Sequence, residues 1–542
     1  MADAGAAGDP PAREAEAAPS SPHTSPALEP QDEADEEELL MDPARQRFSA
    51  VPAEDYNQLP TYPLRPSYRE YHARLRPCSR PVVFDGCPDN PYRPASVPIY
   101  QTATFEQPSS VEFGSYDYSR SGNPTRTALE KQVAMLEHAH AAFAFTTGMA
   151  ALSSITRLLR AGDTLLIGSD IYGGMHRLVN RVTSLHGVNV RMVPTWDLDV
   201  VEAVIKQDGK VRMCHMETPS NPLMRITDIR ALAEILHRYD VLLSVDSTMM
   251  TPHLQQPLNH GADIVVHSMT KFFGGTSDTS GGITCVASEE LAKEIAFFQN
   301  AEGTGLAPFD CWLFLRGIKT LAIRVERAQE NARGVAAFLL RQPAIQEVFY
   351  AGLEPHQEEM RSHVQRARDF KIHMGQAKGG GSLMSFTTGS VELSRRIIDS
   401  LQLFKLTVSF GSCNSLCEMP STLSHASIPA EERTLPDDLI RLSIGIEDVN
   451  DLIEDLAQAL AAATSGQVIR KHRASSMHNA RTEPAAGVAP RPQHLASRPT
   501  HSRLQSGDPL VRPFVLAGAF IAGALVASLA ARSAGRPTAS PV

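Results

Sequence analysis

The chain has 542 residues, which is too long for one ordinary hydrophobic core and predicts a subunit of more than one domain. It is 42% hydrophobic and 21% charged, values that describe a globular protein and exclude a wholly disordered chain. The net charge is −10, but most of the excess acid lies in the first fifty residues, and no long basic stripe interrupts the rest, which argues against nucleic-acid binding.

The N-terminal region begins with an acidic arm. Residues 1–48 are rich in Ala, Pro, Asp and Glu, and they have too little apolar surface to fold alone. They also differ from a transit peptide, which is rich in Arg and Ser and poor in acids. Residues 49–91 are expected to form an N-terminal extension of the folded part.

The seven cysteines are widely spaced, odd in number and not preceded by a secretory signal, so we expect reduced thiols. Cys413, Cys417 and His425 could be imagined as metal ligands, but their spacing matches none of the usual zinc frameworks. No metal site is therefore predicted.

Helical and strand patterns alternate from residue 92 onward. In chain order they are a helix at 125–139, a buried strand at 163–169, a helix at 198–207, and strands at 241–246 and 262–268. Apolar strands in turn with helices predict an α/β domain with a mainly parallel sheet covered on both faces, over residues 92–325.

A second unit follows. A long helical pattern runs from about Arg324 to Leu340, and another covers 447–463. We expect a smaller C-terminal α+β domain over residues 326–464.

The C-terminal tail changes composition again. Residues 465–512 are polar and basic and predict a linker, while 513–532 begin with an uncharged apolar run long enough to cross a bilayer. We expect a transmembrane anchor there, with the catalytic part facing the cytosol. The alternative is an Ala-rich tail of low complexity, and a cytoplasmic or plastid location stays open.

Two charged side chains follow neighbouring predicted strands. Asp246 ends the strand at 241–246, and Lys271 comes shortly after the strand at 262–268. Open α/β sheets bind ligands at the carboxyl ends of their strands, so we expect both side chains in one crevice. An isolated pair of this kind could equally be a salt bridge.

Three further stretches favour a ligand site. In 145–152, "FTTGMAAL", a strand end leads into a helix whose first N–H groups, at Gly148 and Met149, can bind an anion. In 169–174, "SDIYGG", Tyr172 stands in a glycine-flanked loop and can cover a flat ligand. The loop 116–125, "YDYSRSGNPT", is not a core sequence. Together, a helix start that can bind an anion, an aromatic ring that can cover a flat ligand, a carboxylate and a lysine predict a pyridoxal phosphate site. The spacing before Lys271 excludes a P-loop.

These segments resemble the Cys/Met-metabolism family of pyridoxal phosphate enzymes over about residues 92 to 463. The matching segments are 118–126, 146–152, 170–174, 217–222, 245–252, 261–271, 305–321 and 440–456. The resemblance implies pyridoxal-phosphate fold type I, with a large, mainly parallel α/β domain and a smaller C-terminal α+β domain. It also implies a homodimer or homotetramer with active sites shared between subunits.

The resemblance also assigns roles to individual residues. It implies that Lys271 forms the Schiff base with the cofactor and acts as the base, and that Asp246 binds the pyridine nitrogen. It also implies that Tyr172 is catalytic, stacking on the ring, assisting proton transfer and contacting substrate. The expected cofactor contacts are completed by Gly148, Met149, Ser268, Thr270 and Asn221, with Tyr118 and Arg120 from a neighbouring subunit. Arg441, with Ser415 as a weaker companion, is expected to bind the substrate carboxylate.

The implied reaction is carbon–sulfur cleavage. Segments 299–320, 330–333 and 407–412 most resemble plant-type members that split cystathionine at Cβ into homocysteine, pyruvate and ammonia. Asn414 replaces a glutamate of many γ-acting relatives, which favours β-elimination, and Ser247 replaces the usual asparagine. A γ-synthase, a γ-lyase or a cysteine desulfhydrase remains the alternative, and an inactive membrane-tethered scaffold is the alternative of another class.

Overall fold

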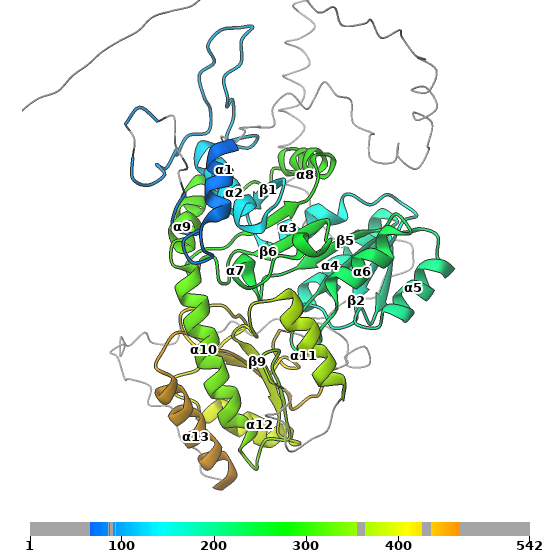
Figure 1. Cartoon of the computed structure of the whole chain (residues 1–542), viewed down its shortest axis with the longest axis vertical. Coiled ribbons are helices and arrows are strands. Elements are labelled where there is room, and N and C mark those ends of the chain that lie inside the picture. Colours follow the sequence, from blue (N-terminus) through cyan, green and yellow to red (C-terminus); the bar gives the residue numbers. More distant parts are fainter. Residues whose placement is uncertain are drawn as a thin grey trace, which may run out of the picture. The chain divides into compact units, whose positions relative to one another are not determined.

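The computed structural model describes residues 66–84, 86, 90–92, 94–354, 364–424 and 435–465. Within these ranges the chain forms two β-sheets with helices packed against them (Figure 1). The predicted helices and strands listed above all occur, with boundaries shifted by a few residues.

The first unit contains a seven-stranded sheet with the strand order β1-β7-β6-β5-β4-β2-β3. Strands β6, β5, β4, β2 and β3 run parallel to one another, whereas β7 is antiparallel to both β6 and β1. The strands are β1 Ala141–Phe145, β2 Thr164–Gly168, β3 Asn189–Val193, β4 Val211–Glu217, β5 Leu242–Asp246, β6 Ile264–Ser268 and β7 Gly282–Val286.

Helices cover both faces of this sheet because successive strand side chains point to opposite sides. Phe143 and Phe145 of β1 pack with α3, α4 and α8, whereas Ala142 and Ala144 pack with α2 and α9. Helices α5 and α6 cover the second face over β2, β4 and β5. The helices are α1 Pro66–Arg74, α2 Pro124–Glu137, α3 Gly148–Thr156, α4 Gly173–Arg181, α5 Leu198–Gln207, α6 Ile229–His237, α7 Thr251–Leu254, α8 Glu289–Glu302 and α9 Pro308–Ile318.

A five-stranded sheet forms the second unit, in the order β10-β11-β12-β9-β8. Its core is shared with α10, α12 and α13. Helix α10 contacts α7 and α9 at one end and β8, β9 and α13 at the other, so it joins the two units (Figure 1). The elements are α10 Leu321–Leu340, β8 Glu347–Phe349, α11 Val364–Gln376, β9 Leu383–Thr387, α12 Val391–Ser400, β10 Lys405–Leu406, β11 Leu416–Glu418, β12 Ile440–Ser443 and α13 Val449–Ser465.

Local sequence explains where α2 and α3 begin. The Asn123 side chain accepts hydrogen bonds from two N–H groups of the first turn of α2, and Pro124 occupies the first helical position. Thr147 caps α3 in the same way by accepting from the Ala150 N–H. Helix α3 therefore begins shortly after the end of β1. The N–H groups of its first turn lie at the edge of the sheet where β1 ends.

The expectation of a transmembrane helix at 513–532 is wrong as it stands. In the described ranges no helix is both long enough and apolar enough to cross a membrane, and residues 513–532 lie outside those ranges. The membrane-anchored location that depended on this helix is withdrawn with it.

Candidate active site

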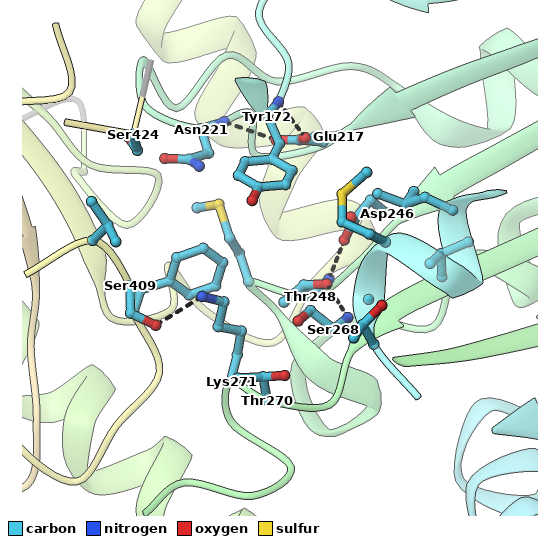
Figure 2. A pocket seen from close by; sticks show the side chains of 18 of the residues that line it. Tyr172, Glu217, Asn221, Asp246, Thr248, Ser268, Thr270, Lys271, Ser409 and Ser424 are labelled. Carbon is cyan, nitrogen blue, oxygen red and sulfur yellow. Dashed lines mark hydrogen bonds between the residues drawn. The ribbon is translucent and has the colours of Figure 1, made fainter. Parts of the chain in front are cut away.

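A cavity of about 410 Å³ lies at the carboxyl edge of the seven-stranded sheet. Its lining comes from the ends of β1, β4, β5 and β6 on one side and from residues 408–410 and β12 on the other. Figure 2 shows the side chains of Tyr172, Asp246 and Lys271 projecting into this common space. The structure therefore brings together charged and aromatic groups that are far apart in the sequence.

An anion nest forms one end of the cavity. Gly148 and Met149 are the first residues of α3, and their side of the helix faces Ser268 at the end of β6. A Cβ atom at position 148 would lie 2.9 Å from Ser268 Oγ, so only glycine permits this close approach. Thr270 also lines the cavity, and its hydroxyl accepts the Gly281 N–H at 3.1 Å. Two free helix N–H groups and two hydroxyls can thus bind one anion.

The Asp246 carboxylate is fixed by its neighbours. Its Oδ1 accepts the Thr248 N–H at 2.9 Å, and Thr248 Oγ1 accepts the Ser268 N–H at 2.8 Å, so one threonine joins β5 to β6 (Figure 2). The Ser247 hydroxyl turns away and donates to Gln255 Oε1 at 3.1 Å. The serine that replaces the expected asparagine therefore makes no hydrogen bond to Asp246 among the described residues.

Tyr172 precedes α4 and is held above the cavity from two sides. Its backbone N–H donates to Glu217 Oε1 at 2.7 Å, and its ring lies against Gly174. A Cβ atom at position 174 would lie 2.2 Å from the Tyr172 ring. The absence of a side chain at Gly174 thus leaves room for the Tyr172 ring, and Tyr172 is 38% exposed.

Lys271 enters the cavity from the opposite side. Its Nζ donates to Ser409 Oγ at 2.8 Å and lies 4.8 Å from the centre of the Phe410 ring (Figure 2). Burial and, to a smaller extent, the Arg441 charge lower the pKa of Lys271 to about 8, while the Glu418 and Asp246 charges oppose this shift. About a tenth of the amine is therefore neutral at pH 7.

Arg441 is buried beside this lysine on β12. Its Nη1 lies 2.7 Å from Glu418 Oε1 and donates to Asn221 Oδ1 at 3.1 Å, and Nη2 donates to the Ser409 carbonyl at 2.7 Å. Glu418 stands opposite Arg441 in the antiparallel register of β11 and β12. The guanidinium therefore has a fixed plane, and its charge is balanced within the protein.

Glu217 also lines the cavity, although the sequence reasoning missed it. It ends β4 directly beside Asp246 of β5, and its two oxygens accept the backbone N–H groups of Tyr172 and Asn221. Burial raises the pKa of Glu217 well above its usual range, and the Asp246 charge adds to this. An acid at the end of an apolar strand was the signal that identified Asp246, and "VRMCHME" carries the same signal.

Other lining residues could not be found from local patterns. Thr248, Ser409 and Phe410 line the cavity, and Glu418 lies behind it in contact with Arg441. Ser409 and Phe410 belong to the segment 407–412, which carried the resemblance without an assigned role. No charge or glycine pattern marks them.

Three of the predicted residues do not line the cavity of their own chain. Ser415 donates both its N–H and its hydroxyl to Glu447, at 2.7 and 2.9 Å. Tyr118 and Arg120 are exposed and lie together, with the guanidinium 5.4 Å from the tyrosine ring centre. Their predicted contact with a neighbouring subunit stays a prediction.

An anion site at a helix start, an aromatic ring, a strand-end carboxylate and a lysine of lowered pKa in one cavity are typical of pyridoxal-phosphate-dependent enzymes. The sequence profile described as Cys/Met metabolism PLP-dependent enzyme matches residues 83–461. This match covers more than half of the chain, and the chain therefore belongs to the Cys/Met metabolism family of pyridoxal-phosphate-dependent enzymes.

Known proteins are similar over the same region. The chain is 50% identical over 370 residues to the chloroplastic cystathionine beta-lyase of Arabidopsis thaliana, covering 68% of this chain and 77% of that one. It is 43% identical over 368 residues to a cystathionine gamma-lyase of Bacillus subtilis, covering 67% and 94%. The crystal structure of cystathionine gamma-lyase from Lactobacillus plantarum complexed with L-serine matches with a TM-score of 0.67 and 36% identity, covering 72% and 100%.

Proposed function

We propose that this protein is a pyridoxal-phosphate-dependent carbon–sulfur lyase that cleaves cystathionine at Cβ. With one water the products are homocysteine, pyruvate and ammonia. The observation that carries the proposal is the cavity that gathers Lys271, Asp246, Tyr172 and Arg441. Identity of 50% to a plant beta-lyase against 43% to a bacterial gamma-lyase favours cleavage at Cβ over Cγ.

The residues of the cavity fit pyridoxal phosphate. The helix N–H groups of Gly148 and Met149 suit its phosphate, the Asp246 carboxylate suits its pyridine nitrogen, and the Tyr172 ring suits its flat face. Lys271 supplies the amine that its aldehyde requires. When bound, the cofactor supplies an electron sink for the charge left on Cα.

Lys271 is the group that moves the proton. Its pKa of about 8 leaves enough neutral amine to accept the Cα proton once the substrate has freed it. The Ser409 hydroxyl, 2.8 Å from Nζ, holds the amine in place before that transfer. The departing sulfur needs one proton, and the protonated Lys271 amine can return the one it took from Cα.

Arg441 is the group that we propose to orient the substrate. A guanidinium binds a carboxylate through paired N–H donors, and Arg441 lines the cavity. Glu418, Asn221 and the Ser409 carbonyl fix its plane, so the substrate meets a guanidinium that does not need to reorganise. The Phe410 ring, next to both Lys271 and Arg441, provides an apolar wall.

Tyr118 and Arg120 support an assembly of at least two chains. Both are exposed and lie outside the cavity of their own chain, and a positive charge near a phosphate completes an anion site. We infer that they reach the cavity of a neighbouring subunit. The large domain at 92–325 and the small domain at 326–464 are proposed as the units of each subunit.

The location of the protein follows the same relatives. The Arabidopsis relative is a chloroplastic protein. We infer a plastid location for this chain, and a fluorescent fusion of the full chain in its own cells would test it.

The identity of the 2-oxo acid product tests the proposed reaction. Purified holoenzyme is incubated with cystathionine, and pyruvate and 2-oxobutyrate are separated by chromatography. We expect pyruvate and homocysteine in equal amounts. Predominant 2-oxobutyrate with cysteine would instead identify a gamma-lyase, and neither product would contradict both.

A further inference from the structure

A cluster of possible metal ligands lies outside the cavity described above. In the described ranges, one group of three such side chains converges, namely Cys78, His253 and Glu326. Their ligand atoms all lie within 4.8 Å of one another. Cys78 follows α1, His253 is in α7 and Glu326 is in α10, so three separate segments meet there.

The distances are close to those of a tetrahedral site. Cys78 Sγ donates to Glu326 Oε1 at 3.1 Å, and His253 Nε2 lies 3.0 Å from the same oxygen. Zinc–ligand bonds of about 2.0–2.3 Å place neighbouring ligand atoms roughly 3.4 Å apart in a tetrahedron. Two sides of the ligand triangle are therefore already near that spacing.

The three kinds of ligand atom suit a soft divalent cation. Thiolate, imidazole and carboxylate are ligands that zinc accepts together, whereas calcium and magnesium prefer oxygen alone.

We propose that Cys78, His253 and Glu326 form a zinc site that fastens the N-terminal segment 66–84 to α7 and α10. Binding replaces the two hydrogen bonds that converge on Glu326 Oε1. The thiol proton is released to solvent, and the imidazole proton moves from Nε2 to Nδ1, which has no hydrogen-bond partner among the described residues. The bound ion, with one thiolate and one carboxylate, carries no net charge, and a water completes the tetrahedron.

Zinc titration of the holoenzyme tests this site. The protein is stripped with a chelator, dialysed, and titrated with Zn²⁺ by calorimetry. We expect one ion per chain with release of one proton, and an affinity at least about tenfold lower in Cys78→Ser and His253→Gln. His237→Gln is the matched control, because His237 Nε2 lies 3.0 Å from Asp263 without a cysteine. Its zinc affinity should equal that of the unmodified chain.

Thiol alkylation gives a second readout that does not depend on affinity. Cys78 is exposed and Cys413 is half-buried, so both can be followed by mass spectrometry. Zinc should slow the alkylation of Cys78 and leave that of Cys413 unchanged. Equal zinc binding by the unmodified chain and Cys78→Ser, no binding by either, or unchanged alkylation of Cys78 would each overturn the proposal.

Discussion

The two walls of the cavity are encoded in different ways. One wall, which we propose binds the cofactor and call the cofactor wall, contains Gly148, Asp246, Ser268 and Lys271 and comes from strand ends and turns of the seven-stranded sheet. The other, which we propose binds the substrate and call the substrate wall, comes from the five-stranded sheet, including the segment between β10 and β11. It contains Ser409, Phe410 and Arg441, with Glu418 behind it. Short local motifs mark the first wall, whereas pairing between distant strands creates the second.

This difference predicts that substitutions in the two walls have different effects on the protein. On the cofactor wall a change removes a chemical group and should leave the fold intact. On the substrate wall a change also leaves a buried charge without its partner, which should cost stability.

Loss of Lys271 tests the cofactor wall most severely. We expect Lys271→Ala to lower kcat by roughly 10⁴-fold or more, because both the attachment of the cofactor and the proton transfer are lost. The visible absorbance of the attached cofactor should disappear as well. Lys405→Ala, at an exposed lysine that donates to Asn414, is the control and should keep both properties. Full turnover by Lys271→Ala would contradict the assignment.

Loss of Glu418 tests the substrate wall. Glu418→Ala leaves the buried Arg441 guanidinium without its carboxylate, and we expect the free energy of unfolding to fall by about 3–5 kcal/mol. Denaturant unfolding measures this change. The double variant Glu418→Met with Arg441→Met removes both charges and should regain much of the loss, although it cannot bind a substrate carboxylate. Equal losses in the single and double variants would show that packing, not charge, sets the cost.

Glu217 connects the two walls. It binds the backbone of Tyr172 over the cofactor wall and that of Asn221, whose side chain contacts Arg441. Glu217→Gln keeps the size of the side chain but removes one of its two acceptor oxygens. If the lost hydrogen bond supports the transition state, the activation free energy rises by about 1–3 kcal/mol. We expect kcat to drop about tenfold with a changed visible circular dichroism of the cofactor.

The control for this change is Glu202→Gln. Glu202 bonds to Arg238 on the surface and should leave both measurements unaffected. If Glu217→Gln lowers thermal stability but leaves kcat and the dichroism unchanged, Glu217 is only structural.

The pH dependence of cofactor attachment gives a smaller effect. Burial and the Arg441 charge lower the pKa of Lys271 to about 8 in the folded protein, and only the neutral amine attacks an aldehyde. The rate at which cofactor-free protein takes up pyridoxal phosphate should therefore rise with pH and level off above about 8. Arg441→Met removes a nearby positive charge and should move that midpoint upward. An uptake rate that does not change between about pH 6 and about pH 9 would contradict the lowered pKa.

The two walls also differ in how much of each could be predicted from the sequence. Alternating apolar strands and helices predicted the large sheet, and the expected order of the strands placed Asp246 and Lys271 in one crevice, where both line the cavity. The pairing of Glu418 with Arg441 could not be predicted, because it depends on the register of β11 and β12. Ser415 shows the same limit, since its backbone and hydroxyl are directed to Glu447 rather than to the cavity. The transmembrane helix expected at 513–532 rested on composition, flanking charges and residue spacing, and no described helix is long and apolar enough to cross a membrane.

Asn414 should have the smallest effect of all. The sequence suggested that this residue favours β- over γ-elimination, because it replaces a glutamate. In the structure Asn414 is exposed, accepts a hydrogen bond from Lys405 at 3.1 Å and does not line the cavity of its own chain. A surface substitution changes free energies by about 0.5 kcal/mol or less, so Asn414→Glu should alter the ratio of pyruvate to 2-oxobutyrate by about twofold at most. A shift of tenfold or more would mean that this surface closes over the cavity during turnover, and the substrate wall would then extend beyond Arg441 and Phe410.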